Sequence, residues 1–214
     1  MKIVLDAACA LGSKYFNKPL SKFSDIVIYS LNGNKNFTAG SGGVLSTENK
    51  NYYIFSKTFL NNGKKHNGYS YKMIGFNLNM SSLNAALALA QIKRFKEIKK
   101  NILQIRNWYK KYLYPINLFN SNFTWGNYFP WMNFFLTKNK KEKISFVAKL
   151  KKKKILVNYF WYPMHKQPIK KNFLLTSFNN TNFIYDRIVV LPSSTFLSHR
   201  QIKNISKIIK KTYV

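Results

Sequence analysis

Residues 24–48 read SDIVIYSLNGNKNFTAGSGGVLSTE, and this stretch decides how the first half of the chain folds. Its β-branched and aromatic run at residues 25–31 is bounded by turn residues, which predicts a buried strand. A second strand is predicted at residues 43–47. Glycine permits positive φ and close backbone approach, and it recurs here at Gly33, Gly40, Gly42 and Gly43. The pattern therefore indicates two strands joined by a tightly folded loop.

Lys35 lies inside this glycine-rich loop. A lysine held between two strands can lose its water shell, and desolvation favours the neutral, nucleophilic amine. Amines of this kind form Schiff bases with carbonyl compounds, of which pyridoxal phosphate is the most common. The alternative interpretation is a solvated turn lysine, because 32 of the 36 basic residues in the chain are lysines.

Composition limits the classes of protein to consider. The chain has 214 residues, 46% of them hydrophobic and 17% aromatic, which indicates a folded protein of one domain or two small ones. We expect no membrane span and no signal peptide, since no apolar run is long enough and the N-terminus lacks the signal architecture. The single cysteine, Cys9, excludes an internal disulfide and suits a reducing cytoplasm.

The net charge of +30 raises the possibility of a nucleic-acid-binding protein. Arginine is the side chain that reads bases and phosphates in a forked geometry, yet lysine outnumbers it eight to one here. The chain is also rich in Asn, Ile, Phe and Tyr, residues that accumulate together with lysine when a coding sequence drifts towards A and T. We therefore interpret the positive charge as a result of this drift in composition. A basic nucleic-acid-binding module stays as a third hypothesis, which rests on charge alone.

Four stretches stand out in order along the chain: LDAACALG at 5–12, SLNGNKNFTAGSGG at 30–43, GFNLNMSSLNAALALAQ at 75–91, and WYPMHKQP at 161–168 followed by LPSS at 191–194. Together they resemble the DegT/DnrJ family of sugar aminotransferases. The branch that they resemble most makes 4-amino sugars of the bacillosamine, legionaminic acid and perosamine type. The resemblance implies an α/β fold, that of the fold type I PLP-transferases. Its expected form is a partial large domain, with a mixed sheet and helices, plus a small C-terminal α+β domain.

The expected domains are residues 1–113, the C-terminal part of the PLP-binding large domain, and residues 114–214, the small domain. Pro115 and an Asn-rich stretch after it favour this boundary. Apolar residues recur at helical spacing from Leu83 to Tyr109 and predict one long interdomain helix over residues 81–113. Further helices are expected at 51–61, 141–153 and 198–211, and further strands at 2–8, 128–137 and 155–159.

The resemblance also implies roles for individual residues. Lys35 would form the Schiff base with pyridoxal phosphate and then move the proton between the substrate carbon and the cofactor. Asp6 would face the pyridine nitrogen and keep it protonated; its alternative role is to cap a helix over residues 7–15, and both can hold at once. Ser30 would bind the phosphate, and Asn77 would reach the cofactor phosphate of the neighbouring subunit in a homodimer.

The implied reaction is transfer of an amino group, with glutamate as donor, to a 4-keto-6-deoxy nucleotide sugar used in cell-surface polysaccharides. Asn32 and His165 are the candidate substrate contacts, and a structural turn histidine is the alternative for His165. No metal site is expected, since His66 has no Cys, His or acidic companion at ligand spacing.

The chain departs from the family pattern at three positions. Cys9 stands where the family has Gln or His near the cofactor ring. Asn79 and Asn158 stand where it has Arg, and a neutral amide binds anions more weakly than a guanidinium. The resemblance begins at the Asp6 strand, so we expect the first half of the large domain to be absent. Either a separately encoded polypeptide supplies it, or the chain is a catalytically inactive remnant or interaction partner.

Overall fold

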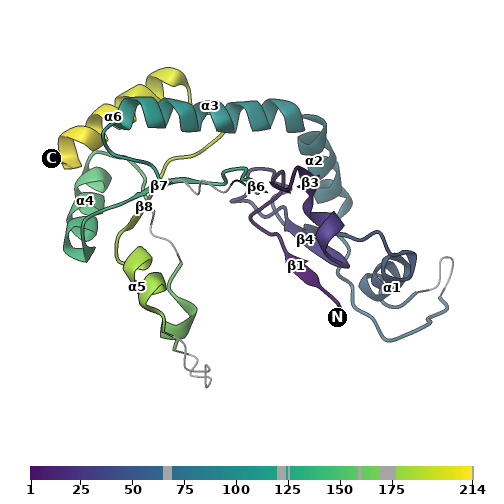
Figure 1. The fold of residues 1–214 in the computed structure, drawn as a ribbon. Coiled ribbons are helices and arrows are strands. Elements are labelled where there is room, and N and C mark those ends of the chain that lie inside the picture. Colours follow the sequence, from purple (N-terminus) through teal and green to yellow (C-terminus); the bar gives the residue numbers. More distant parts are fainter. Residues whose placement is uncertain (65–68, 120–123, 125, 159–160, 169–176, 214) are drawn as a thin grey trace. The chain divides into compact units, whose positions relative to one another are not determined.

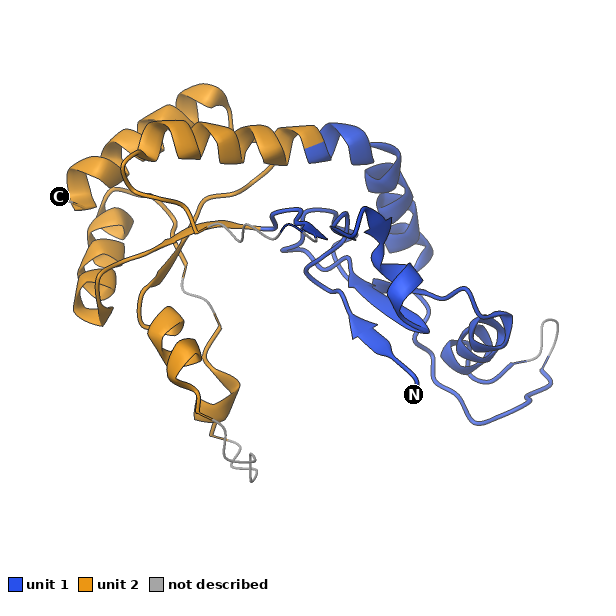
Figure 2. Cartoon of the chain, viewed as in Figure 1, with its two compact units in different colours: residues 1–99, 122–131 blue, residues 100–121, 132–214 orange. Residues whose placement is uncertain are grey.

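The computed structural model describes residues 1–64, 69–119, 124, 126–158, 161–168 and 177–213 (Figure 1). They fall into two compact units, coloured separately in Figure 2. Unit 1 comprises Met1–Lys99 and Asn122–Trp131, and unit 2 comprises Lys100–Ser121 and Met132–Val214. Along the chain, the boundary between the units falls between Lys99 and Lys100, inside the helix that begins after residue 94. The domain boundary expected from the sequence is at residue 113, and that assignment remains a prediction.

Unit 1 contains the predicted mixed sheet. Strands β1 (Val4–Asp6), β4 (Ile26–Ser30) and β5 (Gly43–Ser46) lie in the order β1-β4-β5. β1 runs parallel to β4, and β5 runs antiparallel to it. Val27 in the central strand is fully buried. The strands predicted at 25–31 and 43–47 are confirmed, and the loop between them carries Lys35.

The helix considered for residues 7–15 does not form. The Asp6 carboxylate accepts a hydrogen bond from the Ala8 backbone N–H at 2.9 Å and closes a local turn instead of starting a helix. β2 (Lys14–Tyr15) and β3 (Lys18–Pro19) then make a short hairpin, whose tip residues Phe16 and Asn17 both have positive φ. Strand β6 (Gly126–Asn127) pairs with β2 from the other side, and the 3-10 helix η1 (Leu20–Phe23) leads to β4.

The long helix predicted over residues 81–113 is two helices. α2 (Ser82–Lys93) is capped by the Ser81 hydroxyl, and α3 (Phe95–Leu113) begins after Arg94, whose backbone ends the first helix. The Arg94 guanidinium binds Glu97 at 2.7 Å, and the Phe95 ring stacks on Phe37 of the lysine loop at 4.7 Å. Side-chain contacts made by the first turn of α3 therefore favour a break that helical periodicity does not predict.

The two helices differ in burial. The predicted apolar stripe of α3 is confirmed, with Ile98, Ile102, Ile105 and Tyr109 all buried. α2 exposes its apolar residues, Leu83, Leu87, Leu89 and Ile92. The other helix of unit 1, α1 (Lys50–Leu60), matches the prediction and is capped by the Asn49 side chain. No described helix combines the length and the apolar character that crossing a membrane requires.

Unit 2 is a small α+β unit. Strands β7 (Asn133–Leu136) and β8 (Ile188–Leu191) pair in antiparallel register. Besides the part of α3 from Lys100 onward, its helices are α4 (Lys140–Lys152), α5 (Asn179–Tyr185) and α6 (His199–Tyr213), with the 3-10 turn η2 (Met164–Lys166). The strand predicted at 128–137 is thus shorter. In place of the strand predicted at 155–159, Asn158 makes an isolated bridge to Val190, and residue 159 lies outside the described residues.

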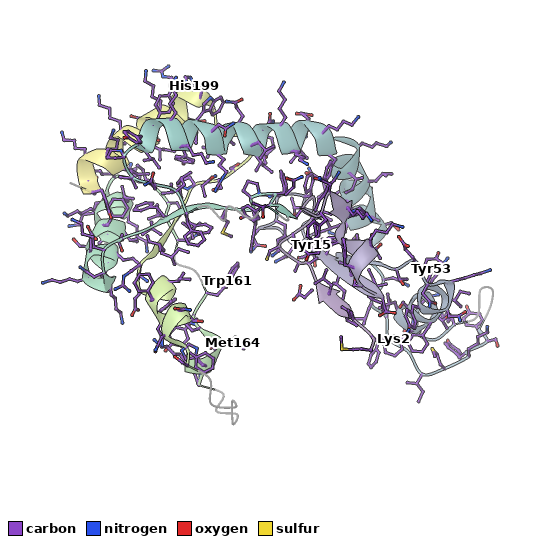
Figure 3. All side chains as sticks on the ribbon, in the orientation of Figure 1. Lys2, Tyr15, Tyr53, Trp161, Met164 and His199 are labelled. Atoms are coloured by element: carbon purple, nitrogen blue, oxygen red, sulfur yellow. The ribbon has the colours of Figure 1, made fainter. Side chains whose placement is uncertain are left out.

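One apolar core holds unit 2 together. It joins α3, α4, α6 and both strands, and its members are Ile105, Tyr109, Leu113, Leu118, Phe135, Phe146, Val147, Leu150, Ile155, Val157, Val189, Leu191, Ile202 and Ile209. His199, labelled in Figure 3, adds a polar contact between α6 and α3, since its Nε2 lies 2.6 Å from the Tyr112 hydroxyl. The Trp108 ring lies 5.0 Å from the same imidazole.

Tyr109→Phe is expected to reveal a pH dependence of unit 2 stability. The fully buried Tyr109 hydroxyl donates to the Pro192 carbonyl at 2.9 Å, and burial raises the pKa of this hydroxyl above the ordinary 10.0. Above that pH the unfolded chain loses the proton first, so Tyr109 stabilises the fold fully below pH 10 and progressively less above it. The variant should be less stable by about 1–3 kcal/mol at neutral pH.

The measurement is urea unfolding of both proteins at several values between about pH 8 and pH 11. The stability gap between them should narrow as the pH rises. A gap that stays constant over this range would contradict the role given to the buried hydroxyl.

Candidate active site

The loop that carries Lys35 is fastened to the end of β4. The Ala39 N–H donates to the Leu31 carbonyl at 2.8 Å, and the Leu31 N–H donates to the Gly42 carbonyl at 2.9 Å. Leu31, Phe37 and Ala39 are all buried and anchor the loop in unit 1. The Lys35 N–H closes a turn onto the Asn32 carbonyl at 3.0 Å. The backbone on both sides of Lys35 is therefore held in place.

The Lys35 side chain is half-buried and has two close partners. Its Nζ lies 3.2 Å from Cys9 Sγ and 3.7 Å from the centroid of the Trp131 ring. Sequence reasoning did not single out Trp131, which follows β6 and is 96 positions away from the lysine. The only local signal was the aromatic run around Pro130, and that run does not indicate which loop it will contact.

Ser30 lies beside Lys35 at the end of β4. Its hydroxyl accepts a hydrogen bond from the Asn32 N–H at 3.2 Å. Together they border a cavity of about 10 Å³, lined by Ala8, Cys9, Leu11, Ser30, Lys35, Asn36, Phe37 and Trp131. The structure thus brings together the predicted Schiff-base lysine and the predicted phosphate ligand.

Asp6 ends the neighbouring strand. Because β1 and β4 are parallel, their carboxyl ends lie at the same edge of the sheet, and Asp6 is paired in register with Ile28, two residues before Ser30. Its carboxylate is exposed at this edge and accepts the Ala8 N–H. Asp6 and Ser30 therefore face the same region from adjacent strands.

The other predicted site residues are placed elsewhere or held by local contacts. Asn77 is exposed and bridges to Asn61, and no described contact joins it to Lys35. Asn32 is exposed in the lysine loop, with its Nδ2 3.5 Å from the Asn34 side-chain oxygen.

His165 belongs to unit 2, where its ring stacks on Phe178 at 4.2 Å and its Nε2 lies 3.0 Å from the Asn182 side-chain oxygen. Trp161 and Met164, labelled in Figure 3, belong to the same unit and expose 59% and 69% of their surface. The contacts of His165 with Phe178 and Asn182 hold its ring within unit 2, and its substrate role stays a prediction.

The groups at the sheet edge suit the cofactor that the resemblance implies. Pyridoxal phosphate presents a carbonyl, a ring nitrogen and a phosphate, which pair chemically with an amine, a carboxylate and a hydroxyl. Lys35, Asp6 and Ser30 supply these three groups from the ends of β1 and β4 and from the loop after β4. The donor set fits, whereas the 10 Å³ beside the amine is far too small for the ring while Trp131 and Cys9 stay in place.

Gly43→Ala is expected to destabilise the lysine loop. Gly43 pairs with Ser30, and a Cβ there would lie 2.6 Å from the Tyr29 carbonyl oxygen, a backbone atom that cannot turn aside. Pushing the strands apart should lower the free energy of unfolding by about 1–3 kcal/mol. Gly33→Ala is the matched control in the same loop, since its Cβ would meet the Gly40 carbonyl at an ordinary 3.5 Å. Thermal unfolding of the pair checks this, and equal losses would contradict it.

The sequence profile of the DegT/DnrJ/EryC1/StrS aminotransferase family matches residues 1–210. The chain is 29% identical over 215 residues to GDP-perosamine synthase of Escherichia coli O157:H7, covering 99% of this chain and 58% of the relative. It is 21% identical over 226 residues to UDP-4-amino-4,6-dideoxy-N-acetyl-beta-L-altrosamine transaminase of Helicobacter pylori, covering 100% and 59%. The chain therefore spans just under three fifths of these relatives.

Solved structures resemble nearly the whole of this chain. Helicobacter pylori PseC, an aminotransferase involved in the biosynthesis of pseudoaminic acid, matches with a TM-score of 0.88 at 21% identity, covering 100% of this chain and 60% of PseC. The sugar aminotransferase CalS13 from Micromonospora echinospora matches with a TM-score of 0.84 at 19% identity, covering 98% and 58%. These similarities confirm the predicted fold class, the fold type I architecture present in part.

Proposed function

Because the chain belongs to the DegT/DnrJ/EryC1/StrS aminotransferase family, we propose that it serves a pyridoxal-phosphate-dependent transfer of an amino group to a nucleotide sugar. The observation that carries this proposal is the position of Lys35, an amine in a braced loop beside Ser30 and next to the strand that ends at Asp6. We propose glutamate as the donor and a 4-keto-6-deoxy sugar nucleotide as the acceptor, for cell-surface polysaccharide synthesis.

Three side chains of this chain would do the chemical work. Bound pyridoxal phosphate supplies an electron-accepting ring that makes the substrate C–H bond acidic. Lys35 would hold the cofactor through Nζ and, once freed by the donor, would take the proton from the substrate carbon and return it. The Asp6 carboxylate would accept the hydrogen bond of the protonated ring nitrogen, and the Ser30 hydroxyl would donate to the phosphate.

The remaining predicted residues concern substrate and partner. Asn32 and His165 are proposed to contact the sugar, and Asn77 is proposed to reach the cofactor phosphate of a second subunit in a homodimer. No specific nucleic acid is proposed as a partner.

A second candidate function is non-catalytic, as an interaction partner that no longer transfers amino groups. Asn79 favours it, because the family resemblance implies an arginine at this position. Here the Asn79 amide donates to the Asn61 side-chain oxygen at 3.0 Å, and a neutral amide engaged locally is a poor anion clamp.

A half-reaction separates the two candidates. The purified chain is saturated with pyridoxal phosphate and mixed with glutamate, and 2-oxoglutarate is measured before and after a 4-keto sugar nucleotide is added. The proposal expects one equivalent of 2-oxoglutarate per chain at first and continued release once the acceptor is present. The absence of any 2-oxoglutarate above a cofactor-only blank would favour the non-catalytic function.

A further inference from the structure

The indole of Trp131 covers the reactive atom of the lysine loop. Lys35 Nζ lies 3.7 Å from the centroid of the Trp131 ring, and Cys9 Sγ lies 3.2 Å from the same nitrogen. The cavity beside the amine measures about 10 Å³, roughly the space that one water molecule needs. A carbonyl compound cannot reach Nζ through this space while both neighbours stay where they are.

The segment that carries the indole is fastened to the loop on both sides of Lys35. Trp131 Nε1 donates to the Asn34 carbonyl at 2.8 Å, and the Asn36 side-chain N–H donates to the Pro130 carbonyl at 3.0 Å. Phe129, two positions earlier, lies with its ring 6.1 Å from that of Phe37. The indole is therefore held by its hydrogen bond to the Asn34 carbonyl and by the contacts that Pro130 and Phe129 make with the same loop.

An aromatic face attracts a lysine cation, and the attraction strengthens when the pair is partly removed from water. At 3.7 Å from the centroid, the amine is in close contact with the face of the ring. The ring therefore both stabilises the amine in its present position and blocks one of its sides. Its removal should leave Lys35 more accessible and less strongly held.

We propose that Trp131 is a positioning residue for Lys35, which holds the amine against Cys9 and shields one side of it, so that a carbonyl group reacts faster at Nζ when the ring is displaced. This inference rests on the proposed function in so far as the carbonyl group is that of pyridoxal phosphate. The Nε1 hydrogen bond to the Asn34 backbone restrains the ring in the covering position. Trp131 thus controls how readily the Lys35 amine reacts with a carbonyl group.

The test is reductive methylation with formaldehyde and cyanoborohydride, followed residue by residue with peptide mass spectrometry. In this reaction the amine adds to the aldehyde carbon, water leaves, and hydride from the reagent reduces the resulting double bond. The rate at Lys35 is divided by the rate at Lys18, an exposed lysine of the same unit. In Trp131→Leu this ratio should rise about fivefold over wild type.

Two further variants sharpen the result. Trp131→Phe keeps an aromatic face and cannot donate to the Asn34 carbonyl, so its ratio should lie between those of wild type and Trp131→Leu. Trp161→Leu removes an exposed indole of unit 2 and should leave the ratio unchanged. A ratio in Trp131→Leu that is equal to or below wild type overturns the proposal, as does a ratio in Trp131→Phe at or above that of Trp131→Leu.

If Trp131→Leu does not fold, Trp131→Phe decides alone. A Lys35-to-Lys18 methylation ratio above that of wild type supports the shielding of Lys35 by Trp131, and a ratio equal to wild type overturns it. Formaldehyde needs no cofactor site, so this outcome is independent of whether the chain binds pyridoxal phosphate. A second series with pyridoxal phosphate and borohydride tests the cofactor itself. Faster methylation at Lys35 in Trp131→Leu, without any pyridoxyl label at Lys35, would support the shielding role of Trp131 and count against the proposed function.

Discussion

Lys35→Ala is expected to abolish the visible absorbance band that pyridoxal phosphate gives when its carbonyl is bound by the chain. The amine of Lys35 is the lysine group that borders the cavity beside Ser30, and its backbone is braced by the turn onto Asn32. Loss of the group that both holds the cofactor and moves the proton should lower amino transfer by on the order of 10³-fold or more.

The measurement is an absorbance titration of wild type and variant with pyridoxal phosphate. Lys18→Ala is the matched control, because Lys18 is exposed in β3 of the same unit and away from the cavity lining. The control should keep the full band. A band of equal strength in Lys35→Ala would show that the cofactor reacts with surface lysines, of which this basic chain has many, and the role given to Lys35 would be wrong.

Phe135→Ala is expected to cause the largest loss of stability in unit 2. Phe135 is fully buried in β7, and its ring makes edge contacts with Phe146 of α4 at 5.6 Å and with Tyr213 of α6 at 5.4 Å. Truncation removes the side chain that joins the strand to both helices and leaves a cavity among them. The expected cost is about 3–5 kcal/mol in the free energy of unfolding.

Urea unfolding followed by far-UV circular dichroism measures this loss. Phe196→Ala serves as control, since Phe196 belongs to the same unit and exposes 81% of its surface. Its replacement should change stability by no more than about 0.5 kcal/mol. A loss below about 1 kcal/mol in Phe135→Ala would mean that the core collapses around the deletion. The packing of the Phe135 ring between β7 and the two helices would then not be a main source of stability.

Much of the secondary structure follows from short-range patterns. The β-branched run before Ser30 and the apolar stripe of α3 are readable because they depend on residue alternation and helical period, each set by neighbours in the chain. The glycine-rich loop around Lys35 is another such short-range pattern, and the family motifs favour a Schiff-base lysine over a solvated turn lysine there.

Other features required contacts between distant residues. The hairpin of β2 and β3 replaced the helix considered for residues 7–15, because β6, more than 100 positions later, pairs with β2. The break at Arg94 depends on the Phe95 ring meeting Phe37 of the lysine loop. Local propensity contains no term for either contact, so it favoured continuous helix in both places.

For the candidate site, the sequence by itself determined the family, the lysine loop and the candidate site residues Lys35, Asp6 and Ser30. Only the tertiary structure decided that Ser30 borders the same cavity as Lys35 and that an indole from 96 positions later lies on its amine. The physical reason is that a motif is a run of residues adjacent in the chain, whereas the packing around one nitrogen depends on which distant side chain the fold brings to it.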